Sequence, residues 1–84
     1  MAKVEITDEA LEQLHGVPLG IVDRVNRGIE NLARWPMVSG VKPLRHDWKG
    51  FYRLRRGDWR IIFRVKQDVV TIVRIINRKD VYED

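Results

Sequence analysis

Cysteine is absent from this 84-residue sequence, so the chain has neither a disulfide framework nor thiolate ligands for a metal. Because small chains in oxidising compartments are usually stabilised by disulfides, we expect a protein of the reducing cytoplasm. No hydrophobic run approaches the ~20 residues of a membrane span. The acidic residue Glu5 also interrupts the N-terminus, where a signal peptide needs an apolar stretch. The sequence thus predicts a soluble, unprocessed protein with no membrane association.

Two further absences restrict the chemistry. The sequence has no glycine-rich phosphate loop, which argues against a nucleotide hydrolase, and no metal-ligand spacing, which argues against a metal-dependent nuclease. We therefore expect neither a cofactor nor a metal. The chain is 44% hydrophobic and 33% charged, enough for a modest core and too apolar for disorder. We expect one domain over residues 1–84.

The charge is unevenly distributed along the chain. Residues 1–40 hold four basic and six acidic side chains, a net charge of −2, whereas residues 41–84 hold twelve and six, a net charge of +6. Eight of those twelve basic residues are arginine. Guanidinium groups bind phosphate through two parallel hydrogen bonds and stack on bases, so this bias favours a nucleic acid as partner.

Hydrophobic periodicity changes along the chain from helical to extended. Val4 and Ile6 alternate with charged residues and suggest a short strand. Three- and four-residue spacings predict one short helix before Gly16 and a second helix over about 18–34, while residues 36–49 read as a loop. Period-two patterns then predict a meander of three strands, at 51–55, 59–66 and 69–76.

These elements predict a two-layer α+β domain, in which the N-terminal strand and two helices pack on one face of an antiparallel sheet that ends in the meander. Strict alternation in the second meander strand places Trp59, Ile61, Phe63 and Val65 on one face and Arg60, Ile62, Arg64 and Lys66 on the other. The other two meander strands add Arg53, Arg55 and Arg74 to a charged face. A purely solvated face that discourages edge pairing explains any single arginine, but not the preference for arginine over lysine.

The residues that follow position 40 carry a family resemblance. It rests on the runs Lys42-Pro43-Leu44, Gly50-Phe51-Tyr52-Arg53-Leu54-Arg55-Arg56-Gly57-Asp58-Trp59-Arg60 and Arg78-Lys79-Asp80-Val81-Tyr82. Together they resemble the RelE/ParE toxin superfamily of type II toxin–antitoxin systems. The resemblance implies a RelE-like fold and a cognate antitoxin as partner.

The superfamily divides by function. RelE-like members enter the ribosomal A site and cleave mRNA, whereas ParE-like members poison DNA gyrase. The residues here resemble the RelE side, which implies that Arg60, Arg78 and Tyr82 are catalytic and that Arg53 and Arg55 bind RNA. The resemblance then implies a metal-independent endoribonuclease that depends on the ribosome and acts in the cytoplasm.

Cleavage by attack of the RNA 2′-hydroxyl would need these residue types. Arg60 and Arg78 would bind the scissile phosphate and its growing negative charge, and Tyr82 would stack on a base or transfer a proton. Lys49 and Arg74 would add contacts to the RNA backbone. His46, beside Asp47, has an imidazole suited to acid–base work. The products would be a 2′,3′-cyclic phosphate and a 5′-hydroxyl.

Two other functions stay open from the sequence. One is a ParE-like gyrase poison without chemistry of its own, and the other is a non-catalytic module that binds RNA or the ribosome. The sequence gives no codon preference and no identity for the antitoxin.

Overall fold

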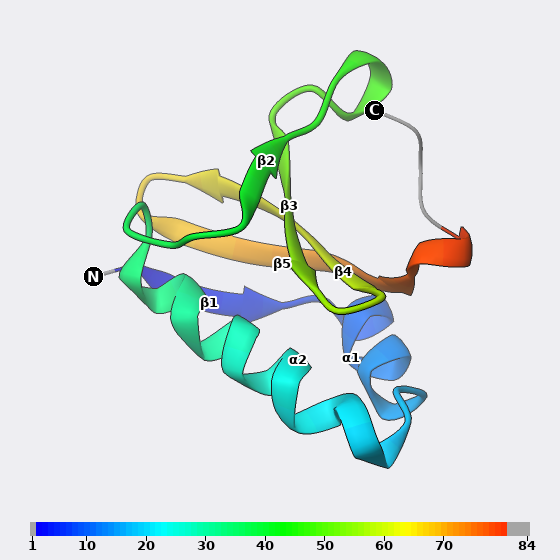
Figure 1. Ribbon diagram of the computed structural model, residues 1–84. Helices are drawn as coiled ribbons and strands as arrows, with labels where there is room; N and C mark the ends of the chain where they lie inside the picture. The colour runs from blue at the N-terminus through cyan, green and yellow to red at the C-terminus, as the bar shows by residue number, and fades with distance from the viewer. Residues whose placement is uncertain (1, 81–84) are drawn as a thin grey trace.

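The computed structural model describes residues 2–80 and contains a five-stranded sheet with two α-helices on one side (Figure 1). In chain order the helices and strands are β1 (Lys3–Ile6), α1 (Asp8–His15), α2 (Leu19–Asn31), β2 (Val41–Pro43), β3 (Phe51–Arg56), β4 (Trp59–Lys66) and β5 (Val69–Asn77). Short 3-10 segments lie at η1 (Leu32–Arg34), η2 (His46–Trp48) and η3 (Arg78–Asp80). The two-layer α+β architecture predicted from the sequence is confirmed.

The strand order is β1-β5-β4-β3-β2, and β3, β4 and β5 form the predicted antiparallel meander. The first strand departs from the prediction, because β1 pairs in parallel with β5, from Lys3 opposite Val69 to Ile6 opposite Ile72. The sheet is therefore mixed rather than wholly antiparallel. Parallel neighbours need a long crossover connection, and here the helices and the other strands all lie between β1 and β5 in the chain.

The segment 36–49 was expected to be a loop, and here the prediction was wrong. It contains β2, which pairs with β3 from Val41 opposite Leu54 to Pro43 opposite Tyr52. A strand of three residues is too short to show a period, and its proline pointed to a turn. Proline is tolerated in β2 because this strand lies at the edge of the sheet.

The strict alternation predicted for residues 59–66 is confirmed in β4: Ile61 and Phe63 lie in the core, Trp59 and Val65 pack against it, and Ile62 faces the other way. The irregularity lies in the neighbouring strand, β5. Ile62 pairs with Arg74 but Phe63 pairs with Ile72, so the register skips Val73. Val73 is thus the extra residue of a β-bulge in β5, which lets Ile72 and Ile75, three residues apart, both pack in the core. A bulge has no signature in a pattern of apolar residues, so the sequence did not indicate it.

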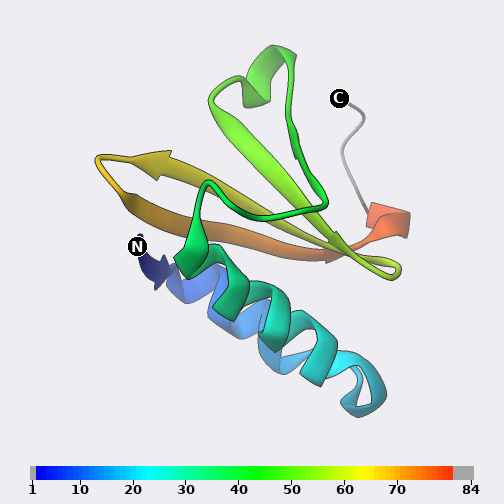
Figure 2. The same cartoon turned by 60° about the vertical axis from the view of Figure 1, so that its left-hand side comes forward.

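Both helices cover the same face of the sheet (Figure 2). The side-chain oxygen of Thr7 accepts a hydrogen bond from the backbone N–H of Ala10 at 3.1 Å and caps the start of α1. Gly28 lets α2 approach the sheet closely, because a Cβ at this position would lie 3.2 Å from Ile61 Cδ1 and 3.3 Å from Leu54 Cδ2. Within residues 2–80, no helix is long and apolar enough to cross a membrane.

Candidate nucleic-acid interface

The face of the sheet that is turned away from the helices carries most of the arginines predicted to bind RNA. Leu54 and Ile61 point into the core under the helices, so their neighbours along β3 and β4 point the other way. Arg55 is directly opposite Arg60, and Arg53, Ile62 and Arg74 lie in one row across three strands. We call this surface the arginine face, defined by Arg53, Arg55, Arg60 and Arg74 together with Arg78 just beyond β5.

Arg60 is the buried member of the arginine face, with only 7% of its surface exposed. Its Nη1 donates to the carbonyl oxygens of Gly57 and Trp59, at 3.1 and 3.3 Å. Its Nε is buried too and has no hydrogen-bond acceptor among the described residues. The two backbone contacts fix the guanidinium and leave its buried Nε–H unpaired among the described residues.

The electrostatics around Arg60 disfavour its charge. Burial lowers the pKa of Arg60 most, and the nearby charges of Arg55, Arg53 and Arg78 lower it further, in that order. The Nε of Arg53 is likewise buried without an acceptor among residues 2–80. A group of partly desolvated cations that repel one another gains most from a bound anion, and a phosphate matches the guanidinium geometry. The arrangement is therefore suited to bind phosphate.

Arg78 is brought beside this group by the turn between β3 and β4. Its backbone N–H donates to the carbonyl oxygen of Asp58 at 2.6 Å, and its Nη1 lies 3.6 Å from the Asp58 carboxylate. Both side chains are exposed, so the ion pair is weak, but the backbone contact joins the end of β5 to the turn. The structure thus places Arg78 near Arg60, as the sequence prediction requires.

Other predicted residues lie farther along the sheet, around η2. His46 and Lys49 are both exposed, at the start of η2 and just after its end. Arg74 forms an ion pair with Glu9 of α1, and its guanidinium carbon lies 6.0 Å from the centre of the Trp48 ring. Tyr82, the third predicted catalytic residue, lies outside the described residues.

Trp48 was missed by the reasoning from sequence. It stood in a segment interpreted as a loop, in which only His46 and Lys49 were named as candidate site residues. Its ring contacts Phe51 edge to face, with 5.1 Å between centroids. One signal in the sequence could have indicated Trp48. It is a tryptophan that belongs to no amphipathic pattern, two residues before the glycine that precedes β3.

Comparison with known proteins decides the family. A family model for the ParE toxin of the type II toxin–antitoxin system parDE matches residues 4–82. Toxin RelG of Mycobacterium tuberculosis is 34% identical over 82 residues, which cover 94% of this chain and 93% of the relative. The chain belongs to the RelE/ParE toxin superfamily.

Solved structures agree with the assignment of this RelE/ParE toxin. The toxin in the toxin–antitoxin complex RelBE2 from M. tuberculosis matches with a TM-score of 0.80 and 31% identity, over 92% of this chain and 98% of that chain. A chain of the RelB–RelE antitoxin–toxin complex from Methanococcus jannaschii shares the fold, with a TM-score of 0.74 and 24% identity over 89% and 91% of the two chains. The resemblance inferred from the sequence is confirmed.

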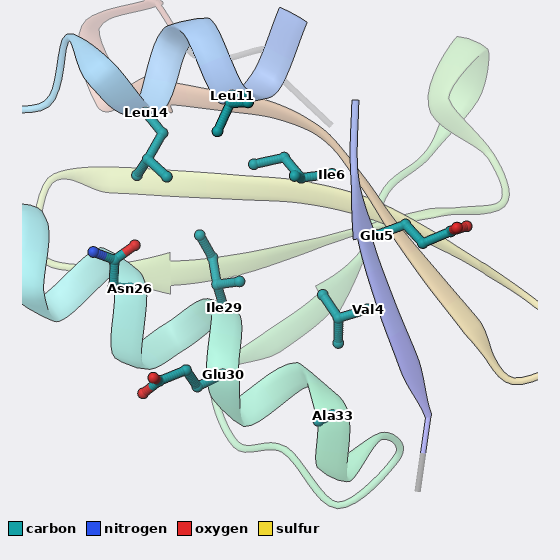
Figure 3. A pocket seen from close by; sticks show the side chains of 9 residues that line it. All are labelled: Val4, Glu5, Ile6, Leu11, Leu14, Asn26, Ile29, Glu30 and Ala33. Carbon is teal, nitrogen blue, oxygen red and sulfur yellow. The ribbon is translucent and has the colours of Figure 1, made fainter. Parts of the chain in front are cut away.

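Two hollows in the surface of this RelE/ParE toxin differ in chemistry. One, of about 370 Å³, adjoins β2 and is lined by Lys42, Arg53 and Arg55 together with residues of the neighbouring turns. The other, of about 460 Å³, lies between β1, α1 and α2 and is mainly apolar, with Val4, Ile6 and Ile29 among its lining side chains, whereas the carboxylate of Glu5 points away from it (Figure 3). Basic side chains attract a polyanion and an apolar lining does not, so the hollow beside the arginine face is the one that suits RNA.

Proposed function

We propose that this toxin is RelE-like: a ribosome-dependent mRNA endoribonuclease that inhibits translation in the cytoplasm. The observation that carries the proposal is the buried guanidinium of Arg60, which is fixed by two backbone carbonyls yet keeps its Nε–H without an acceptor among the described residues. A merely solvated sheet face has no reason to bury a cation among other cations. A buried cation is expected, however, in a site that binds a phosphate whose negative charge increases during the reaction.

In this proposal the cleavage has three requirements. Arg60 and Arg78 bind the non-bridging oxygens of the scissile phosphate and stabilise the negative charge that builds as the 2′-oxygen attacks. Arg53 and Arg55 hold the RNA backbone on either side. The 2′-hydroxyl loses its proton and the 5′-oxygen leaves with one, so a 2′,3′-cyclic phosphate and a 5′-hydroxyl result.

Candidates for the proton transfers are Tyr82 and His46. His46 lies in η2 and is exposed to the solvent, which leaves it free to reach a substrate held on the ribosome. Tyr82 enters through its match to the family's C-terminal tyrosine. The proposal assigns no metal to the reaction, and no group of three potential metal ligands occurs among residues 2–80.

A cognate antitoxin is the second proposed partner. The solved relatives include complexes of a RelE-type toxin with its antitoxin, from M. tuberculosis and M. jannaschii. An antitoxin segment with acidic and apolar side chains would complement Arg53, Arg60 and Arg78 and keep RNA away from the arginine face. Adding the antitoxin should therefore abolish RNA cleavage by the toxin, and co-expression of the two proteins should abolish the growth arrest.

The test is induced expression in bacteria with mapping of mRNA 5′ ends. The proposal predicts growth arrest and new mRNA ends in reading-frame register, both lost in Arg60→Met. Arg27→Met is the matched control, because Arg27 is an exposed arginine of α2 on the other side of the sheet. Tyr82→Phe then asks whether the phenol transfers a proton.

A gyrase poison is the second candidate, favoured by the match to the ParE family model over residues 4–82. It predicts growth arrest with intact mRNA and with DNA damage. In that case changes at Arg78 and Tyr82 should be tolerated, while changes on α1 and α2 should abolish toxicity. That pattern would disprove the nuclease proposal.

A further inference from the structure

Trp48 has surroundings unlike those of the other two tryptophans. Trp35 and Trp59 pack against the main hydrophobic core, between the sheet and the helices. Trp48 is half-buried and does not belong to that core. It contacts Phe51 and the guanidinium of Arg74, at the end of the arginine face that is remote from Arg78.

The segment that carries Trp48 is held firmly by its backbone. The Trp48 N–H donates to the carbonyl of Arg45 at 3.0 Å, and the Lys49 N–H donates to the carbonyl of His46 at 3.1 Å. Before this turn, the Leu44 N–H donates to the carbonyl of Phe51 at 2.9 Å, and the Leu44 side chain is buried. The ring is thus placed by a fixed turn rather than by a loose loop, which favours preorganised binding.

The chemistry of this corner fits a nucleobase. Tryptophan offers the largest aromatic surface for stacking, and single-stranded nucleic acids bind proteins by placing bases on such rings. Arg74 adds a planar cation beside the ring, and its ion pair with Glu9 holds that guanidinium in place. A base therefore finds an aromatic surface and a planar cation at one position.

The corner is within reach of RNA bound at Arg60. Arg74 is opposite Ile62, two residues along β4 from Arg60, and Phe51 lies four residues along β3 from Arg55. At ~3.3 Å per residue these steps span about 7–13 Å along the sheet. That distance corresponds to two to four nucleotides stacked at ~3.4 Å.

We propose that Trp48 and Arg74 form a stacking subsite for one base of the mRNA whose phosphate lies at Arg60. The inference rests on the proposed function and extends it by a base-contacting residue. It predicts that one nucleotide near the cleaved linkage contributes through its base, whereas the phosphates on the arginine face contribute regardless of sequence.

The experiment uses ribosomes programmed with a 2′-O-methylated mRNA, which cannot be cleaved by the 2′-hydroxyl route. In a series of such mRNAs, an abasic residue replaces each nucleotide of the A-site codon and its flanks in turn. The affinity of the toxin is measured for every position. With the natural toxin, one abasic position should weaken binding about fivefold or more. Trp48→Leu should weaken binding of the intact mRNA about as much, and the abasic residue at the sensitive position should then weaken it no further. Trp48→Phe should bind the intact mRNA with an affinity between those of Trp48→Leu and the natural toxin.

Thermal unfolding of each variant and the Arg27→Met control separate binding from folding. The stacking subsite is refuted if Trp48→Leu binds intact mRNA as the natural toxin does, or if its loss is the same at every abasic position. The proposed function is tested separately, by cleavage of unmodified mRNA on the same ribosomes by the natural toxin. Absence of that cleavage contradicts the nuclease, whereas the abasic scan alone decides the subsite.

Discussion

Replacing Arg60 by methionine should separate the stability of this toxin from its activity. The folded state disfavours the Arg60 charge, since burial lowers its pKa and Arg55, Arg53 and Arg78 lower it further. Methionine keeps most of the buried aliphatic volume and removes the charge. The loss of two hydrogen bonds, to the carbonyls of Gly57 and Trp59, acts in the opposite direction.

The two effects have similar sizes. Hydrogen bonds from a charged donor contribute about 1.5–3 kcal/mol each, and we take the lower limit here because the carbonyl partners lie in or next to a turn, where water can replace the donor. Replacing a buried ionic group by a hydrophobic one of similar volume is often neutral or stabilising by about 1–4 kcal/mol. We therefore expect the free energy of unfolding to change by less than about 1 kcal/mol. Cleavage should fall by about 10²–10³-fold, as when one donor to a developing charge is removed.

Thermal unfolding with and without inorganic phosphate tests this reasoning. If phosphate binds at Arg60, a concentration ten times its Kd stabilises the natural toxin by about 1.4 kcal/mol, which corresponds to a rise in Tm of about 6–11 °C. Arg60→Met should lack this increment and keep only the general stabilisation by phosphate, whereas the Arg27→Met control should keep both. A destabilisation of about 2–5 kcal/mol, the range for truncated core residues, would refute the reasoning, because Arg60 would then be a structural anchor.

Three further predictions concern the fold and the charge. Gly28→Ala should lower the free energy of unfolding by about 0–2 kcal/mol in chemical denaturation, because the contact of the new Cβ with Ile61 Cδ1 at 3.2 Å costs about 1–3 kcal/mol and the helix propensity of alanine offsets about 1 kcal/mol; a clear gain in stability would mean that the packed neighbours move away freely. Thr7→Ala should cost about 1 kcal/mol through loss of the α1 cap, whereas Thr7→Ser should restore most of it. Arg55→Ala should reduce the slope of log affinity for single-stranded RNA against log salt concentration by about 0.7, and an unchanged slope would place Arg55 away from the RNA.

Much of the fold followed from local patterns in the sequence. The start of α1 could be predicted because Thr7 is a good capping residue and acidic residues follow it. The meander could be predicted because Gly57 marks the turn between two alternating segments. The parallel pairing of β1 with β5 could not, since it depends on which edge of the sheet a distant strand reaches.

The sequence predicted which arginines share the candidate site, but it did not predict which of them is buried. Period two placed Arg53, Arg55 and Arg60 on one face, and the structure agrees. Nothing in the sequence indicated that Arg60 alone would be buried, because that depends on neighbouring strands and on the turn carbonyls above it. Trp48 escaped for a similar reason, since its contact with Arg74 of β5 joins segments that are far apart in the sequence.

The distribution of burial explains how a small domain tolerates so many arginines on one surface. Arg55 and Arg78 are exposed, so water and salt screen the repulsion between them. Within the arginine face, Arg60 alone combines like-charged neighbours with nearly complete burial, so the electrostatic cost of this face is concentrated in one side chain. A bound phosphate relieves that cost at the position where the proposed reaction builds negative charge. The arginine of this face whose charge the fold disfavours most is therefore the one expected to stabilise the transition state most.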